Sequence, residues 1–141
     1  MGHLPLYGIS VGREKPGEFL DQAENLRALL EKYQVHTYIS GHDHAYFPGH
    51  RGKLQLLQTG ALGTGPRRWL DSDLSPRKTL TVVDIGLTDV STRYTTYDLT
   101  NKTVLDSKIL PRMIAAHNGP VLRRDIAPSE LTAKEKMQFW T

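Results

Sequence analysis

Two histidines one residue apart, His42 and His44, are the side chains of this 141-residue chain best suited to bind a metal. They follow a short apolar segment, residues 35–39, which predicts a β-strand, and Gly41 lets the chain turn where that strand ends. On an extended chain, side chains two residues apart point the same way, so both imidazoles could reach one metal or two adjacent metals. Imidazole is also a routine hydrogen-bonding group, so the pair alone leaves an ordinary structural role open.

A third histidine, His3, stands near the start of the chain and also follows a glycine. It precedes His42 by 39 positions (42 − 3), which a loop, a helix and a strand fill. That length fits one crossover between two parallel strands at the same edge of a sheet. Because loops at the carboxyl ends of strands in an open α/β sheet meet in one crevice, we expect the three histidines to lie close together.

The two histidine motifs together resemble those of a known family. Gly-His-Leu-Pro-Leu-Tyr at residues 2–7 and Gly-His-Asp-His-Ala-Tyr at residues 41–46 match the last two metal-binding motifs of the calcineurin-like metallophosphoesterases in order and spacing. The purple-acid-phosphatase-like branch of that family is the most similar. The resemblance covers residues 1 to about 110 and does not include the C-terminal segment.

The resemblance implies a metal-dependent hydrolase that acts on phosphoester bonds at a dinuclear centre. It implies that His3 and His42 hold one metal and His44 the other, and that the metals are two ions of Mn, Fe or Zn in a complete site. Tyr46, which ends the second motif, and Arg67, a cation that follows a glycine-rich turn, are the candidate contacts to a phosphoester substrate.

Three earlier motifs of the family are not in this sequence: Asp-x-His, Gly-Asp-x-x-Asp, and Gly-Asn-His followed by an acidic residue. In the family they supply the carboxylates, the asparagine and the histidine that protonates the leaving group. The resemblance therefore implies the C-terminal half of a metallophosphoesterase, with the catalytic residues expected in the absent half. Asp43 is expected to point away from the metal on an extended strand. We interpret the remaining histidines as structural or surface residues: His36, His50 and His117.

The expected fold class is α/β: the C-terminal half of the family's α/β/β/α sandwich, with one amphipathic helix plus mixed or antiparallel strands. A helix that opens at Pro16 and Glu18 is predicted by apolar residues spaced alternately four and three apart, which places them on one core-facing stripe. The stripe consists of Phe19, Ala23, Leu26, Leu30 and Tyr33.

Further along, residues 45–52 are predicted to form a loop and turn, and residues 53–59 a strand. Alternating side chains then predict an antiparallel meander of three strands. A metallophosphoesterase part over residues 1–114 is expected to be followed by an extension, residues 115–141, whose short terminal helix starts at a capping box of Thr132 and Glu135. The three predicted strands are Thr79–Ile85, Val90–Leu99 and Thr103–Ile109.

Charge and composition indicate which partners to expect. Eighteen basic and fifteen acidic residues give a net charge of +3, which is spread along the chain and typical of a solvated surface, so no nucleic-acid partner is expected. No apolar run approaches the roughly 20 residues of a membrane span, and no membrane partner is expected. Cysteine is absent, which leaves the compartment open.

Two hypotheses of different kinds follow. In the first, the chain is the C-terminal portion of a metal-dependent phosphoesterase that is incomplete, and inactive, as this isolated chain. In the second, it is a non-catalytic metal-binding or self-associating module from a truncated gene product. Either way a half-sandwich leaves an apolar edge and face uncovered, so we expect a homo-oligomer or a complementary N-terminal chain.

Overall fold

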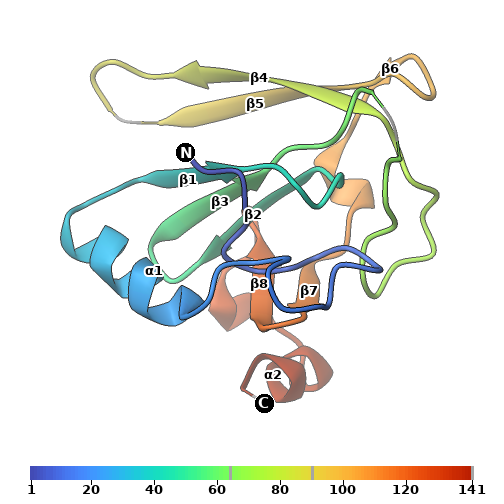
Figure 1. The fold of residues 1–141 in the computed structure, drawn as a ribbon. Helices are drawn as coiled ribbons and strands as arrows, with labels where there is room; N and C mark the ends of the chain where they lie inside the picture. Colours follow the sequence, from blue (N-terminus) through green and yellow to red (C-terminus); the bar gives the residue numbers. More distant parts are fainter. Residues whose placement is uncertain (64, 90, 141) are drawn as a thin grey trace.

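The computed structural model describes residues 1–63, 65–89 and 91–140, which form two β-sheets and two α-helices (Figure 1). Figure 1 shows the β4–β5 hairpin of the smaller sheet above the larger sheet, α1 at the lower left beside it, and α2 below it. The α/β class predicted from the sequence is therefore confirmed. None of the helices in the described part of the chain is long and apolar enough to cross a membrane.

The larger sheet has five strands in the order β1-β3-β2-β8-β7. β1 and β3 run parallel, with Ile39 opposite Leu57, whereas the other neighbouring pairs are antiparallel. β3 matches the strand predicted over residues 53–59. The strands are β1 (Thr37–Ser40), β2 (Phe47–Arg51), β3 (Leu54–Gln58), β7 (Met113–Ala116) and β8 (Gly119–Arg123).

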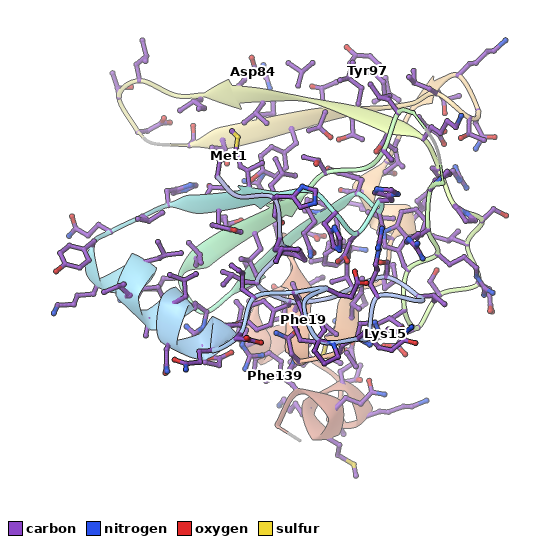
Figure 2. The ribbon with its side chains drawn as sticks, viewed as in Figure 1. Met1, Lys15, Phe19, Asp84, Tyr97 and Phe139 are labelled. Carbon is purple, nitrogen blue, oxygen red and sulfur yellow. The ribbon has the colours of Figure 1, made fainter. Side chains whose placement is uncertain are left out.

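The smaller sheet is the predicted antiparallel meander: β4 (Thr79–Ile85), β5 (Thr92–Asp98) and β6 (Thr103–Val104). Its two faces differ because side chains alternate along each strand. Val83 and Tyr94 pack against the core, whereas Asp84 and Tyr97 lie on the outer face, away from the larger sheet (Figure 2). The predicted strand start at Val90 lies outside the described residues.

The first helix, α1 (Ala23–Lys32), begins five residues later than Glu18, where the sequence predicted its start. Ala23 is buried and the middle of the predicted stripe packs as expected, with α1 against β3. The prediction was wrong for the two ends of the stripe. Phe19 lies before the helix and stacks on the ring of His117, and Tyr33 is exposed. The residues before α1 form tertiary contacts instead of a first helical turn.

The prediction of a loop over residues 45–52 was also wrong, because β2 occupies most of it. Pro48 and Gly49 are typical turn residues, yet both are buried in this strand. Pro48 is paired with Leu57 of β3. On the β8 side its carbonyl accepts a hydrogen bond from the Arg124 N–H at 2.8 Å, one residue beyond the last ladder pair, where the missing N–H of proline is tolerated. Gly49 is required for packing, since a Cβ there would lie 2.6 Å from Cγ1 of Val121.

The C-terminal third contains more sheet than was predicted. The strand expected over Thr103–Ile109 ends at Val104, and a short 3-10 helix follows at Ser107–Ile109, capped by the side chain of Asp106. β7 and β8 form a hairpin that the sequence did not indicate, and the boundary predicted after residue 114 falls inside β7. A second 3-10 turn, Pro128–Glu130, leads to the terminal helix.

The terminal helix α2 (Ala133–Trp140) starts at the predicted capping box. Thr132 Oγ1 accepts a hydrogen bond from the Glu135 N–H at 3.2 Å, and Glu135 Oε1 accepts one from the Thr132 N–H at 2.9 Å. Phe139 packs against a small apolar cluster that includes Met113 and Leu122 of the β7–β8 hairpin. The helix therefore covers part of the larger sheet.

Candidate metal centre

The loop that carries His3 and the loop that carries His42 meet at the carboxyl end of β1. Gly2 forms a parallel bridge with Ser40, and its N–H donates to the Ile39 carbonyl at 2.9 Å. The Gly41 N–H in turn donates to the His3 carbonyl at 3.1 Å. The 39-residue connection therefore does return beside its start, through an isolated parallel bridge instead of the predicted first strand, and it places the two imidazoles beside each other.

The rings of His3 and His42 touch edge to face. Their centroids are 4.9 Å apart with an interplanar angle of 72°, and Nε2 of His3 lies 3.1 Å from Nδ1 of His42. Without a metal, the N–H of one of these nitrogens donates a hydrogen bond to the other, and the tautomers of the two rings decide which one is the donor. An open, largely apolar hollow of about 600 Å³ lies beside His3, lined by residues 1–3, residues 39–41 and Thr59.

The other side of the His42 ring faces an acidic residue. Nε2 of His42 lies 2.5 Å from Oε2 of Glu18, and the same oxygen accepts a hydrogen bond from Nη1 of Arg13 at 3.1 Å. The hydrogen bond to His42 and the nearby Arg13 charge hold the pKa of Glu18 below its usual range. Arg13, Glu18, His42 and His3 thus form one continuous polar chain.

His44 does not join this pair. The sequence prediction assumed an extended chain, but the φ angles of His42 and His44 are 67° and 53°, in the left-handed region that few non-glycine residues occupy. The Asp43 N–H donates to the Gly41 carbonyl at 2.8 Å, so the chain makes a tight three-residue turn centred on His42. Nδ1 of His44 instead lies 3.0 Å from the carbonyl oxygen of Gly65.

Asp43 points away from the His3–His42 pair, into the interior, and is fully buried. Its carboxylate accepts hydrogen bonds from the Ile9 N–H at 2.9 Å, from Oγ of Ser10 at 3.2 Å and from Nε2 of Gln58 at 3.2 Å. Burial raises the pKa of the Asp43 carboxyl, and the bonds from Ile9 and Ser10 oppose that rise. Asp43 therefore fixes the turn that presents the histidines.

The two predicted substrate contacts have different surroundings. Tyr46 is buried in the main core, where its backbone carbonyl accepts a hydrogen bond from Nε1 of Trp69, so its phenol offers no surface to a substrate. Arg67 stays near the turn, since its N–H donates to the His44 carbonyl at 3.0 Å. Its Nη1 donates to the Val11 carbonyl at 3.3 Å, which leaves the guanidinium half-buried beside the glycine-rich loop.

The geometry of the His3–His42 pair fits two ligands of one metal. Metal–nitrogen bonds of about 2.0–2.1 Å set ligand nitrogens roughly 2.9 Å apart at a right angle and roughly 3.4 Å apart at a tetrahedral angle. The observed 3.1 Å lies between these values. Among the residues that the structure describes, no group of three or more His, Asp or Glu side chains is placed so that it could hold a metal ion.

The other histidines are bound to nearby oxygens. A ring nitrogen of His36 lies 2.6 Å from the Thr37 hydroxyl, one of His50 lies 2.7 Å from the Ile126 carbonyl, and one of His117 lies 2.8 Å from the Ser10 carbonyl. Sequence reasoning missed Glu18 and Arg13 as partners of His42. The only signal for them was a long loop after His3, since loops of that length are often functional.

Comparison of the chain with family models, with curated proteins and with solved structures found no match.

Proposed function

We propose that this chain is the C-terminal part of a metal-dependent phosphoesterase, in which His3 and His42 bind one metal ion and His44 contributes to a second. Mn, Fe or Zn suits imidazole ligands combined with carboxylates. The carboxylates and the catalytic residues are not in these 141 residues, so hydrolysis requires a further segment or chain that supplies them. As an isolated chain the protein is proposed to be inactive.

The observation that supports this proposal most directly is the 3.1 Å separation between Nε2 of His3 and Nδ1 of His42. The two residues are 39 positions apart, and the backbone bonds between the Gly2–His3 segment and β1 hold their loops together. The left-handed φ of His42 costs of order 1–3 kcal/mol, a kind of strain that clusters at functional sites. A bound metal would polarise phosphoryl oxygens and lower the pKa of a bound water.

Other residues of this chain would then bind and orient the phosphoester substrate. Arg67, whose backbone N–H donates to the His44 carbonyl, is the candidate cation for a phosphoryl oxygen, because a planar guanidinium can make two parallel hydrogen bonds. The hollow beside His3 is lined mainly by apolar atoms and suits the less polar part of a phosphoester. Tyr46 is left out of this proposal, since the core encloses it.

Metal binding by the purified chain tests the proposal. Native mass spectrometry with added zinc or manganese is expected to show a bound metal that is lost in His42→Ala and in His3→Ala. His36→Ala is the matched control, because its ring bonds Thr37 and lies away from the pair. A chain that binds neither metal, or that binds them equally in all three variants, contradicts the proposal.

A second candidate is a non-catalytic metal-binding module that self-associates. The outer face of the smaller sheet favours it, because Leu80, Val82 and Tyr97 are exposed there side by side. The two candidates differ in one outcome: hydrolysis of a generic phosphomonoester by the metal-loaded chain together with the proposed N-terminal segment supports the enzyme. A metal-loaded assembly that stays inactive with that segment supports the module.

A further inference from the structure

We propose that Glu18 is a positioning residue for His42. Its carboxylate accepts a hydrogen bond from the Nε2–H of His42 and so leaves Nδ1 as the free nitrogen that faces His3. This inference rests on the proposed function, because Nδ1 is then the atom that His42 presents to a metal. It also assigns a role to the segment just before α1 that carries Glu18, which the sequence prediction treated as the start of a helix.

The proton assignment follows from what each group can donate. An ionised carboxylate only accepts hydrogen bonds, so the contact between Oε2 of Glu18 and Nε2 of His42 at 2.5 Å requires the proton on Nε2. A neutral imidazole carries one ring proton, so Nδ1 then has a free lone pair. Nδ1 of His42 lies 3.1 Å from Nε2 of His3, so it is the nitrogen that His42 can offer to an ion shared by the two rings.

Glu18 is itself held in place. Nη1 of Arg13 donates to the same carboxylate oxygen at 3.1 Å, and the side chains of Arg13 and Glu18 are only 16% and 22% exposed. The backbone around Glu18 is tied as well: its N–H donates to the Lys15 carbonyl at 3.1 Å, and the Leu20 N–H donates to the Pro5 carbonyl at 2.9 Å. The carboxylate therefore approaches His42 from a fixed segment and not from a free side chain on the surface.

A carboxylate behind a metal-binding histidine fixes both its tautomer and its ring orientation, and removing such a partner typically costs 10–100-fold in metal affinity. A purely structural ion pair between Glu18 and His42 predicts something different. It predicts a change in the free energy of unfolding, with no change in the tautomer of His42 and no specific loss of affinity. The two roles can therefore be separated by measuring the tautomer directly.

The experiment compares Glu18→Ala and Glu18→Gln with the control Glu14→Ala, an exposed glutamate in the same loop. Long-range ¹H–¹⁵N correlation spectra of the metal-free chain report the His42 tautomer, and competition with a chromophoric chelator reports zinc affinity. We expect the Nε2–H tautomer in the unmodified chain and in Glu14→Ala. Glu18→Ala should give a tautomer mixture and a 10–100-fold weaker affinity, and Glu18→Gln a loss below tenfold, because its amide oxygen still accepts.

An unchanged tautomer together with an unchanged zinc affinity in Glu18→Ala overturns the inference. Failure of the proposed function looks different: the unmodified chain then binds no zinc at all. In that case the tautomer spectra of the metal-free proteins still decide whether Glu18 positions His42. A tautomer shift in Glu18→Ala supports that role, and no shift rejects it.

Discussion

Oδ2 of Asp43 lies 2.9 Å from the backbone nitrogen of Ile9, which ties the turn between His42 and His44 to the segment that follows His3. The Asp43 carboxylate is buried and takes two further hydrogen bonds, from Ser10 and Gln58. One side chain therefore joins both histidine loops to the core. The orientation of the candidate ligands depends on this residue, although it faces away from them.

Replacing Asp43 with alanine should destabilise the fold. The change leaves the buried Ile9 N–H without an acceptor and removes one acceptor from Gln58, so we expect the free energy of unfolding to fall by about 2–4 kcal/mol. Urea denaturation followed by circular dichroism measures this. Asp73→Ala is the control, because that side chain is fully exposed and should change stability by less than about 0.5 kcal/mol. Equal losses of unfolding free energy in the two variants would show that the hydrogen bonds of Asp43 do not stabilise the fold.

The left-handed turn at His42 predicts an unusual order of stability between two variants. Glycine adopts a φ of 67° without steric cost, whereas alanine does not, so His42→Gly should be more stable than His42→Ala by about 1 kcal/mol. Both variants should lose the metal. At His36, which is outside the left-handed region, the order should reverse, with glycine less stable by about 0.5–1 kcal/mol. Thermal unfolding of the four proteins checks the sign at each position.

The Asp98 carboxylate should make stability depend on acidic pH. Burial by itself raises the pKa of Asp98, but hydrogen bonds from Arg77 at 2.6 Å and from Asn101 at 3.0 Å outweigh it and lower the pKa below its usual range. A carboxylate with a lowered pKa in the folded state contributes stability above its unfolded pKa of about 3.9, and loses it as the pH falls through the folded value.

Asp98→Asn should therefore lower the free energy of unfolding at pH 7 by about 1–3 kcal/mol and flatten the loss of stability below about pH 4. Denaturation at a series of pH values between 2 and 7 measures both effects. Asp84→Asn is the control, since the Asp84–Arg93 pair is exposed and separated by 3.4 Å. If the free energy of unfolding falls as steeply below pH 4 in Asp98→Asn as in the unmodified chain, the prediction is contradicted.

The outer face of the smaller sheet predicts self-association. Leu80 is paired with Tyr97 across the β4–β5 ladder, Val82 follows on the same face, and these side chains are 40–46% exposed. Sedimentation velocity should show an assembly larger than one chain that shifts toward the monomer in the double variant Leu80→Thr, Val82→Thr. Val11→Thr, an equally exposed valine in a loop, should leave the assembly unchanged. A monomer at all concentrations would exclude this face as an interface.

Features with local physical causes could be predicted from the sequence. Alternating side chains indicated β4 and much of β5, and the Thr132–Glu135 capping box located the start of α2, because in each case the signal lies within a few residues. The spacing between His3 and His42 predicted their meeting at one end of β1, since a crossover between parallel strands needs a chain of about that length.

Features that depend on distant partners were decided only by the tertiary structure. β2 forms through Pro48 and Gly49 because β3 and β8 flank it, which overrides the turn preference of these residues. The left-handed turn at His42 exists because Asp43 bonds to residues 33 and 34 positions earlier, and this separates His44 from the pair. Glu18 reaches His42 across 24 positions. Residue types and spacing thus determined which side chains could bind a metal, whereas long-range hydrogen bonds decided which of them face each other.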